Sequence, residues 1–289
     1  MATRHRPQLT DAARPATYEV EAYNERGEMV PTAIAGEHPL TLYLDRREIV
    51  TLMTLGHAPE ALAIGYLRNQ RLVGSIDEIA AVQVDWETDS VVVTTRPRHR
   101  SAAHKNLKKA MAKRTVTTGC GQGTVFGDLM EEIDEVKLRD EVRLADAQLF
   151  DLVEKVRKHE TIYKQSGAVH GCALARTAGP ASAEIMMFIE DVGRHNAVDA
   201  IAGIMWLDGI DGSDKIFYTT GRLTSEMVIK CAQMRIPFLV SRSGLTQMGH
   251  EIAQKVGITM LGRASGRHYL LFTGKHRLVL SATRPTAFA

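Results

Sequence analysis

The sequence predicts an α/β protein, in which a small α+β region precedes a mixed-sheet α/β domain. Two observations carry this prediction. Short and almost continuously apolar segments recur after residue 170, and segments with the apolar spacing of helices separate the later ones. Strands that are apolar on both faces are typical of parallel or mixed sheets covered by helices. With 289 residues the chain is long enough for one large domain or two moderate ones.

The first part of the chain alternates polar and apolar segments. Residues 1–16 are polar, contain proline and arginine, and are expected to form a disordered tail. The apolar stretches 40–44 and 49–53 flank a charged tetrapeptide and predict a β-hairpin. A helix is expected to open at residues 58–60, because proline is favoured in the first helical turn. Valines alternate with polar residues over 82–93, which predicts a second hairpin with one buried face.

The pattern changes near residue 144. A helix is expected after Asp146, which we assign as its N-cap, because apolar residues recur at helical spacing over 149–156. Strands are predicted at residues 173–175, 185–189, 216–219, 238–240 and 259–261, and helices at 197–205, 225–233 and 246–256. We therefore expect a tail at 1–16, an α+β region at 17–143 and an α/β domain at 144–289.

Composition excludes several classes of protein. The formal net charge is only +2, which argues against a dedicated nucleic-acid-binding protein. The N-terminus lacks the apolar segment of a secretory signal, and no apolar run approaches the ~20 residues that span a bilayer. Three widely spaced cysteines do not form a disulfide framework and indicate a reducing compartment. We expect a cytoplasmic protein without nucleic-acid or membrane partners.

Cys120 is the candidate reactive residue. A glycine on each side leaves little bulk around it and allows positive φ, so we expect its thiol at the tip of a loop. Residues 96–114 carry eight Lys and Arg and no acidic residue, and nearby positive charge favours the reactive thiolate. The other interpretation of this basic run is a solvated helix face. Cys172 and Cys231 stand in apolar segments and are expected in the core.

Polar clusters that contain arginine follow four of the predicted strands, at residues 190–199, 220–226, 241–244 and 262–267. Ligands usually bind at such strand ends, and arginines, N–H groups and helix N-termini together suit phosphate. We therefore predict a bound anionic, nucleotide-like ligand. Singly, the arginines could form surface ion pairs, and Asn196, Thr224 and Thr246 could merely cap helices. His195 is either a general base or a structural histidine.

Two kinds of chemistry are disfavoured by missing motifs. No G-x-x-x-x-G-K-[ST] loop is present, which argues against hydrolysis of ATP or GTP. A zinc nucleobase deaminase requires His-x-Glu and Pro-Cys-x-x-Cys, and neither occurs. The run His170-Gly171-Cys172 has no Cys-x-x-Cys nearby, so we predict no metal site.

The blocks of the second half resemble the FdhD family, the formate dehydrogenase accessory sulfurtransferases. The resemblance is carried by residues 166–170, 190–199, 220–230 and 237–243, and a weaker similarity covers residues 40–75. It implies a sulfur carrier and sulfurtransferase that takes sulfur from a cysteine desulfurase as a persulfide. The sulfur then passes to the bis-molybdopterin guanine dinucleotide form of the molybdenum cofactor, which formate dehydrogenase receives. The resemblance also implies a cytidine-deaminase-like second domain and a homodimer.

The resemblance assigns roles to individual residues. Cys120 falls on the family's persulfide position. The segment that binds the guanine nucleotide end of the cofactor corresponds to Arg263, Ala264, Ser265, Gly266, Arg267 and His268. From the arginine-containing clusters we add Arg194, Arg222, Ser241 and Arg242 as cofactor-binding candidates.

Two departures from the family pattern matter. The family loop usually reads Cys-Gly-x-Cys, whereas the fourth position here is Gly123. The family's arginine within Gly-Phe-x-Arg-Gly corresponds to Ser265, with Arg263 and Arg267 nearby. The alternative function is a non-catalytic chaperone that binds the molybdenum cofactor for formate dehydrogenase without carrying sulfur.

Overall fold

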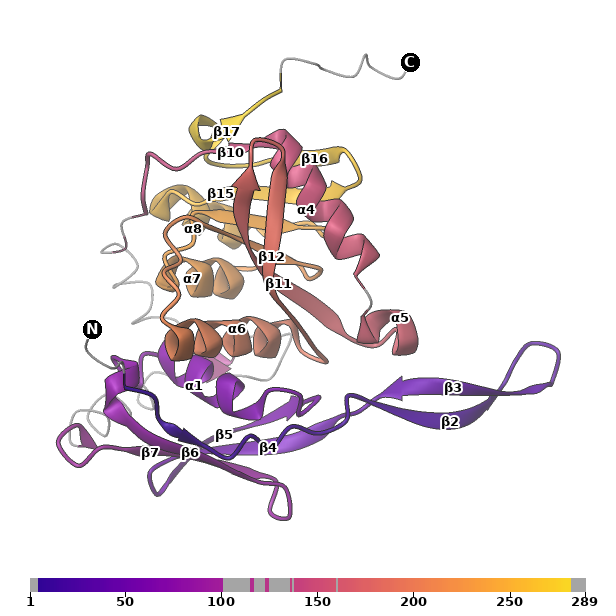
Figure 1. Cartoon of the computed structure of the whole chain (residues 1–289), viewed down its shortest axis with the longest axis vertical. Coiled ribbons are helices and arrows are strands. Elements are labelled where there is room, and N and C mark those ends of the chain that lie inside the picture. Colours follow the sequence, from indigo (N-terminus) through magenta and orange to yellow (C-terminus); the bar gives the residue numbers. More distant parts are fainter. Residues whose placement is uncertain are drawn as a thin grey trace. The chain divides into compact units, whose positions relative to one another are not determined.

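The computed structural model describes residues 5–100, 115–116, 123–124, 136, 138–159 and 161–281 (Figure 1). The chain divides into two compact units that alternate along the sequence. Unit 1 comprises Met1–Asp134, Glu160–Cys172 and Ile189–Ile210, and unit 2 comprises Glu135–His159, Ala173–Phe188 and Asp211–Ala289. Residues 160–172 and 189–210 thus follow the expected boundary at residue 144 and yet belong to unit 1.

Unit 1 is built on a five-stranded sheet with the order β1-β6-β7-β4-β5. Its strands are β1 (Gln8–Leu9), β4 (His38–Leu44), β5 (Arg47–Thr54), β6 (Ile79–Asp85) and β7 (Ser90–Thr95). The pairs β4–β5 and β6–β7 are antiparallel, so both predicted hairpins are confirmed. A 3-10 turn, η1 (Ile76–Glu78), precedes β6.

Two helices of unit 1 pack closely against each other. Helix α1 (Pro59–Asn69) begins at the predicted proline, and α6 (Arg194–Asp208) lies against it. A Cβ added at Gly65 of α1 would stand 1.7 Å from the carbonyl oxygen of Asp199, and one added at Gly203 of α6 would stand 2.0 Å from that of Ala61. Two glycines therefore allow the two helix backbones to touch.

The expected disordered tail is corrected for residues 5–16. Strand β1 pairs in parallel with β6, and the ring Nε2 of His5 hydrogen-bonds the carbonyl oxygen of Ile79 (2.7 Å). The indole N–H of Trp86 donates to the carbonyl oxygen of Ala12 (2.5 Å). Partners more than 70 residues away hold this segment, and its composition gives no sign of them.

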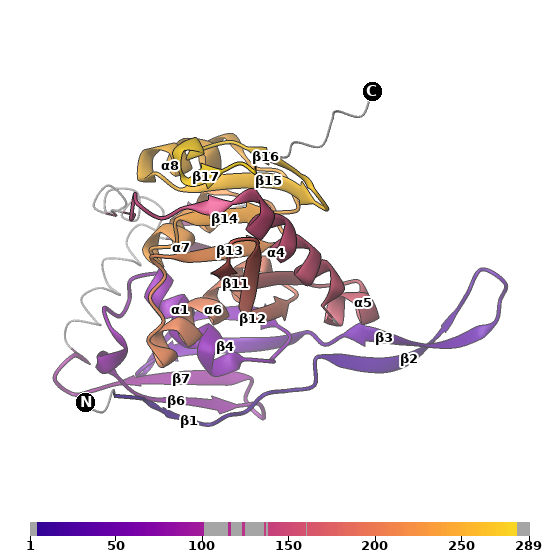
Figure 2. The same cartoon turned by 45° about the horizontal axis from the view of Figure 1, so that its top comes forward.

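A third hairpin of unit 1 has no counterpart in the sequence prediction. Strands β2 (Thr17–Tyr23) and β3 (Met29–Ala35) form a two-stranded sheet of their own. Figures 1 and 2 both show it extending away from the five-stranded sheet. Near its base the short helix α5 (Ile162–Ser166) contacts both strands.

Unit 2 contains most of a six-stranded mixed sheet with the order β12-β11-β13-β14-β15-β16. The strands are β11 (His170–Gly179), β12 (Ser182–Asp191), β13 (Lys215–Thr219), β14 (Phe238–Ser241), β15 (Thr259–Ser265) and β16 (His268–Leu271). Strands β13, β14 and β15 are parallel, and β16 returns antiparallel to β15. The chain passes between the two units along β11 and β12.

Helices cover this sheet. Residues of α4 (Asp146–Lys158) share a buried apolar cluster with Ile216, Tyr218 and Val240. The alternate residues Phe217 and Leu239 are buried as well, which means that both faces of the sheet are covered. Helices α7 (Ser225–Gln233) and α8 (Gln247–Val256) pack against each other, and α8 packs against β15 (Figure 2). The predicted α/β class is confirmed.

The remaining elements are short. Strands β10 (Leu144–Ala145) and β17 (Leu278–Val279) pair in parallel, η3 (Lys275–Arg277) precedes β17, and β8 (Thr115–Val116) pairs with β9 (Gly123–Thr124). Within the described ranges, no helix has the length and apolar character needed to cross a membrane.

One predicted cap is wrong. Asp146 is the first residue of α4, and Ala145 occupies the N-cap position. The Asp146 carboxylate instead accepts hydrogen bonds from the N–H (3.0 Å) and the hydroxyl of Ser281. Ser281, 135 residues away, thus binds the carboxylate that the local pattern assigned to the N-cap of α4.

Candidate functional site

Two of the four arginine-containing clusters follow the neighbouring strands β13 and β14, and a third, residues 262–267, begins within the next strand, β15. In the parallel strands β13, β14 and β15, Thr219 lies opposite Ser241 and Val240 lies opposite Leu261. Their carboxyl ends therefore lie at the same edge, where ligands of such sheets usually bind. We refer to residues 219–224, 241–246 and 262–263 as the arginine edge.

Hydrogen bonds fix the segments of the arginine edge to one another. Ser241 is fully buried, and its hydroxyl donates to the carbonyl oxygen of Gly221 (2.7 Å) and accepts from the N–H of Ser243 (2.9 Å). The Ser243 hydroxyl donates to the carbonyl oxygen of Thr220 (2.8 Å). The N–H of Arg263 donates to the carbonyl oxygen of Ser243 (3.0 Å). Ser241, a predicted ligand-binding residue, therefore holds these segments together.

The arginine edge exposes three guanidinium groups. Arg222, Arg242 and Arg263 are all exposed; Arg222 and Arg242 follow β13 and β14, and Arg263 lies within β15. Arg263 has a φ of 52°, in the left-handed region that residues other than glycine rarely adopt. Guanidinium groups on three neighbouring segments offer planar sets of N–H donors, which match the oxygens of phosphate groups.

The predicted nucleotide-binding segment is a hairpin and not a loop after a strand. Strand β15 continues to Ser265, which pairs with His268 of β16. Gly266, with a φ of 57°, opens the two-residue turn at a position that favours glycine. The register shifts between Gly262 and Ser265, so that two residues of β15 face one residue of β16. Such a bulge bends the strand, and it coincides with the unusual φ of Arg263.

The side chains of this hairpin point in different directions. Ala264 is buried in the apolar core of unit 2, while Ser265, Arg267 and His268 are exposed. The guanidinium carbon of Arg267 lies 5.2 Å from the ring centre of Phe150, at cation–π distance. Within the predicted segment, the exposed residues are therefore the ones that can reach a ligand with their side chains.

A cavity adjoins the arginine edge. It has a volume of about 410 Å³ and is lined by Gly244, Leu245, Thr246, Gln247, His250, Arg263 and Phe272. Thr246 caps α8, because its hydroxyl accepts from the N–H of Gly249 (3.2 Å). The cavity thus combines a helix N-terminus, a guanidinium group and an imidazole, which suits an anion.

His250 and Phe272 were missed by the sequence prediction. His250 lies one turn after the predicted cap Thr246, and this spacing places both on the first turns of one helix. That spacing was the available signal for His250. Phe272 follows β16, a strand that the sequence did not predict, and no local pattern indicated its place in the cavity.

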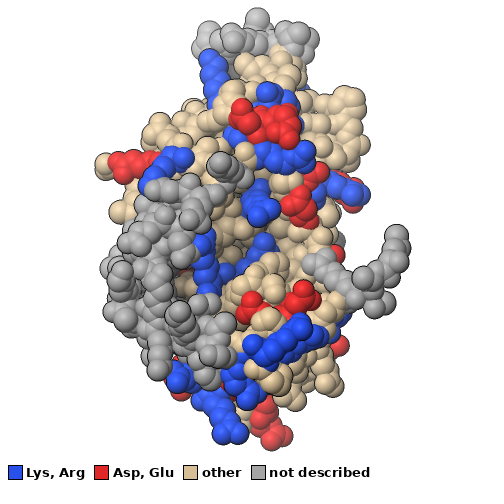
Figure 3. Space-filling model, turned by 90° about the vertical axis from the view of Figure 1, so that its left-hand side faces the viewer, with Lys and Arg blue, Asp and Glu red and all other residues tan. Residues whose placement is uncertain are grey.

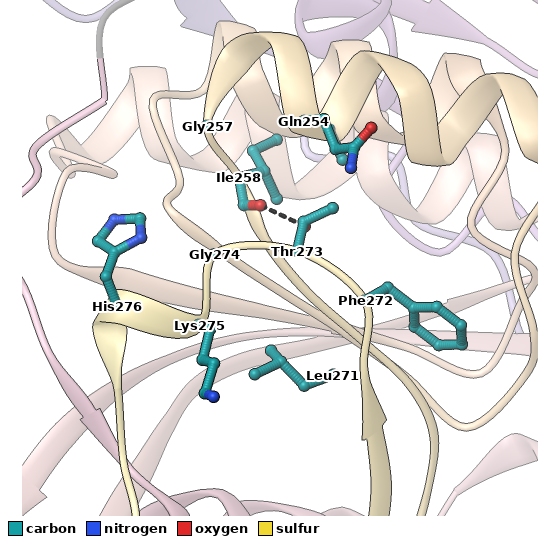
Figure 4. Close-up of a pocket in the computed structure, with 10 residues that line it drawn as sticks. Gln254, Gly257, Ile258, Leu271, Phe272, Thr273, Gly274, Lys275 and His276 are labelled. Carbon is teal, nitrogen blue, oxygen red and sulfur yellow. Dashed lines mark hydrogen bonds between the residues drawn. The ribbon is translucent and has the colours of Figure 1, made fainter.

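A second cavity of about 480 Å³ lies near the C-terminal end of α8, between Ala253–Ile258 and Leu271–His276. Figure 4 shows that Gln254 and Lys275 point to opposite sides of the backbone segment that bears Thr273 and Gly274. The hydroxyl of Thr273 donates to the carbonyl oxygen of Ile258 (2.6 Å) and so is engaged in the wall. No predicted site residue lines this cavity, and its polar groups do not converge.

Arg194 differs from the other three arginines. It is the first residue of α6 in unit 1, and only 8% of it is exposed. His195 is buried beside it. Asn196, for which helix capping was one interpretation, lies inside the helix, and Gly193 is the N-cap. The side-chain amide of Asn196 donates to the carbonyl oxygen of Met53 (2.7 Å). This cluster therefore offers few exposed polar groups to a ligand.

Asp191 holds the cluster at residues 190–199 in place through internal hydrogen bonds. Its buried carboxylate accepts hydrogen bonds from the Thr54 hydroxyl (2.5 Å), the Leu55 N–H (3.2 Å), the Gly193 N–H (3.1 Å) and the Asn196 amide (2.8 Å). Burial raises the pKa of Asp191 above its usual value, and the four donors act in the opposite direction. The carboxylate joins the start of α6 to the end of β5.

Two further acidic residues of the same block have structural partners. The Glu190 carboxylate accepts from the N–H groups of Ile162 (2.6 Å) and Tyr163 (3.1 Å) at the start of α5. Asp199 is fully buried and accepts from the side-chain amide of Asn69 (2.7 Å). Residues 190–199 therefore act as an internal anchor of unit 1.

Cys120 lies outside the described residues. The paired strands β8 and β9 are described, with Thr115 opposite Thr124 and Val116 opposite Gly123. Residues 117–122, which include Cys120, link these two strands along the chain. Cys172 and Cys231 are both fully buried, as predicted.

Most of the basic run 96–114 also lies outside the described residues. Of its described members, Arg96 hydrogen-bonds the ring of His5 (2.9 Å), and Arg100 lies 3.9 Å from the carboxylate of Asp45. Figure 3 shows a face on which basic side chains form several groups, some of them beside acidic ones. The described members of the run thus have partners, and its Lys and Arg residues at 105–114 lie outside the described residues.

Comparisons with known proteins show which family and which fold this chain resembles. The model of the FdhD/NarQ family matches residues 35–279. The sulfur carrier protein FdhD of Wolinella succinogenes is 28% identical over 248 residues, which cover 86% of this chain and 83% of the relative. The protein of the same name from Listeria innocua is 29% identical over 251 residues, which cover 86% and 92%.

A solved structure supports the fold. The crystal structure of a formate dehydrogenase accessory protein from Desulfotalea psychrophila superposes with a TM-score of 0.72 and covers 92% of this chain and all of its own. Its sequence identity is 24%, so the match concerns the fold. The family match, in contrast, spans both hairpins of the five-stranded sheet, the anchor at residues 190–199 and the whole arginine edge. The chain therefore belongs to the FdhD/NarQ family.

Proposed function

We propose that this chain is a sulfurtransferase that carries sulfur on Cys120 to a molybdenum cofactor destined for formate dehydrogenase. The observation that carries the proposal is the family match, whose relatives are named sulfur carrier proteins. The acceptor we propose is the bis-molybdopterin guanine dinucleotide form of the cofactor. It is bound as a substrate, in keeping with an arginine edge suited to phosphate groups.

The proposed sulfur step needs one reactive thiol. The Cys120 thiolate attacks the outer sulfur of a persulfide on a cysteine desulfurase. The sulfur–sulfur bond of the donor breaks, its cysteine leaves as a thiolate, and Cys120 bears the new persulfide. Gly123 stands where relatives usually have a second loop cysteine, so a single loop thiol performs the transfer here.

The burial of the other thiols supports this assignment. The chain has three cysteines, and both Cys172 and Cys231 are fully buried in their units. Buried structural thiols are inert towards large partners, because exchange requires access of one sulfur to another. Cys120 is therefore the residue on which we expect a desulfurase to load sulfur.

The arginine edge supports the proposed acceptor. The exposed arginines Arg222, Arg242 and Arg263 provide donors for the pyrophosphate groups of a dinucleotide. The adjoining cavity of about 410 Å³ lies within the range of about 300–1,000 Å³ typical of small-molecule sites. The capped start of α8 adds N–H groups at one wall of the cavity. We propose that the guanine nucleotide end of the cofactor binds here.

The decisive experiment is mass spectrometry of the intact chain after incubation with a cysteine desulfurase and cysteine. We expect the mass of one added sulfur atom, lost on treatment with a reductant and absent from Cys120→Ala. Cys231→Ala serves as the matched control and should load sulfur like the unchanged chain. An adduct that persists in Cys120→Ala would contradict the assignment.

The alternative function is a chaperone that binds the cofactor without carrying sulfur, and the absent second loop cysteine is the feature that favours it. The same experiment separates the two functions. A chain that gains no sulfur but still binds the cofactor would support the chaperone. Formate dehydrogenase that matures normally with Cys120→Ala would exclude a persulfide on this residue.

A further inference from the structure

The turn of the β15–β16 hairpin carries an arginine that rests on an aromatic ring of α4. The guanidinium carbon of Arg267 lies 5.2 Å from the ring centre of Phe150. Figures 1 and 2 both show this hairpin beside α4. A guanidinium group held on the face of a ring has less freedom of movement before any ligand arrives. The family resemblance assigns a binding role to Arg267 and none to Phe150.

Phe150 is fixed by the core on one side and by the hairpin on the other. Its neighbour in α4, Leu149, is fully buried in the core of unit 2, whereas Phe150 itself is half-buried. The ring of Tyr269 packs against that of Phe150, with ring centres 5.8 Å apart and planes inclined by 39°. Tyr269 follows Arg267 by two residues, the spacing that directs side chains to one face of a strand. The hairpin therefore places both side chains against the same ring.

The carboxylate nearest to these rings binds elsewhere. Asp146 lies one turn before Phe150 on α4, and its carboxylate accepts hydrogen bonds from the N–H (3.0 Å) and the hydroxyl of Ser281. Burial, and secondarily the charge of Asp146, raise the pKa of Tyr269 above its ordinary value of 10.0, so that the phenol is neutral at pH 7. Arg267 thus meets two neutral rings and not an anion.

The donors of the Arg267 guanidinium remain available. Within the part of the chain that the structure describes, no hydrogen bond or ion pair engages this group. Arg176, by contrast, is an exposed arginine of the same unit that pairs with Glu184 (2.8 Å). Stacking uses the face of a guanidinium group, whereas its N–H groups lie in the plane and point outward. A stacked Arg267 can therefore bind a phosphate oxygen and keep its contact with the ring.

We propose that Phe150 is a positioning residue for nucleotide binding, because it holds Arg267 in an orientation that presents the N–H groups to a phosphate. The inference rests on the proposed function, since Arg267 belongs to the segment assigned to the nucleotide end of the acceptor. A side chain that is already restrained loses less conformational entropy on binding, so the affinity for the ligand is higher. The restraining ring belongs to α4, more than 100 residues before the hairpin, and no motif of the hairpin indicates it.

Calorimetric titration of the full chain with guanosine diphosphate tests the proposal. Arg267→Ala should weaken binding by about tenfold or more, because hydrogen bonds to a charged group are lost. Phe150→Leu should weaken binding by about 2–5-fold, which corresponds to a cation–π contact at an exposed site. In the Arg267→Ala background, Phe150→Leu should cause no further loss, because the ring then has no guanidinium group to hold.

Two further variants separate positioning from a general effect on the core. Phe150→Tyr keeps the ring and should restore the affinity of the unchanged chain. Phe188→Leu is the matched control, because Phe188 packs against the same apolar core and its ring neighbour is His159, at 5.1 Å, and not an arginine. It should leave the affinity unchanged even where it lowers Tm. Circular dichroism melting verifies that each variant is folded.

The possible failures of this experiment are distinguishable. If Arg267→Ala weakens binding and Phe150→Leu does not, the inference is wrong and the proposed nucleotide site stands. Equal losses from Phe150→Leu with and without Arg267, or an equal loss in Phe188→Leu, would also overturn the inference. So would an Arg267→Ala variant that binds normally. A chain that binds no guanosine diphosphate at all would contradict the proposed nucleotide site, and the inference with it.

Discussion

The close contact between α1 and α6 predicts how Gly65→Ala changes stability, because helix propensity and packing act in opposite directions at this position. Gly65→Ala replaces a glycine in the interior of a helix, which by helix propensity alone stabilises the protein by about 1 kcal/mol. The new Cβ, however, would stand 1.7 Å from the carbonyl oxygen and 2.6 Å from the carbonyl carbon of Asp199. Real Cβ contacts essentially never fall below 3.0 Å, so the two helices must separate.

The size of the loss in stability depends on which groups have to move to relieve this clash. Overpacking of a well-packed interior costs typically 1–3 kcal/mol, and this clash involves two helix backbones and no flexible side chain. The same displacement would strain the hydrogen bond of 2.7 Å between Asn69 and Asp199. We therefore expect Gly65→Ala to lower the free energy of unfolding by about 2 kcal/mol or more, despite the gain in propensity.

Thermal unfolding measures this effect. For domains of 150–250 residues, 1 kcal/mol shifts Tm by about 2–4 °C, so Tm should fall by roughly 4–8 °C. Gly244→Ala is the matched control, because its new Cβ would meet nothing within 4 Å and its φ is not positive. An unchanged or higher Tm for Gly65→Ala would refute the close approach of α1 and α6 and the reasoning built on it.

Two further predictions concern charges of unit 2. Arg263→Ala should weaken binding of guanosine diphosphate, measured by calorimetry, by about 10–100-fold, because a hydrogen bond to a charged group contributes about 1.5–3 kcal/mol. Arg176→Ala, which removes an exposed arginine paired with a glutamate, should leave that affinity unchanged, and equal losses in both variants would contradict the proposed site. Burial alone would raise the pKa of Asp151, but hydrogen bonds, among them one of 2.7 Å from Lys155, hold it below its ordinary value of 3.8. The ionised carboxylate therefore stabilises the fold above pH 3.8, and this contribution disappears as pH falls through the lower folded pKa. Melting of Asp151→Asn between about pH 5 and pH 2 should accordingly depend less on pH than melting of the unchanged chain. Identical pH profiles for the two would show that Asp151 contributes nothing.

The elements that the sequence predicts correctly are those with a local signature. The hairpins β4–β5 and β6–β7 show as alternation and turns, and α1 shows as a proline followed by apolar spacing. The arginine edge was predictable for the same reason. Each of its clusters follows a run of apolar strand residues, and parallel strands bring the ends of such runs to one edge.

The anchor at residues 190–199 shows where local reasoning ends. The sequence treats this block as a fourth ligand cluster with Arg194 as a binding residue. In the structure, Asp191 is bonded to Thr54 across 137 residues, and Arg194 is buried. A carboxylate that accepts four internal donors looks the same in sequence as one that binds a ligand, because both are polar residues after a strand.

The sequence by itself determined the α/β class, the order of most strands and helices, the family blocks and the candidate thiol Cys120. These depend on periodicity, on turn residues and on short motifs, all of which act over a few neighbouring positions. Only the tertiary structure decided that residues 160–172 and 189–210 join unit 1, that the first residues pair with β6, and that the Asp146 carboxylate binds Ser281. Each of these depends on hydrogen bonds and packing between segments distant in sequence, and such contacts leave no local pattern.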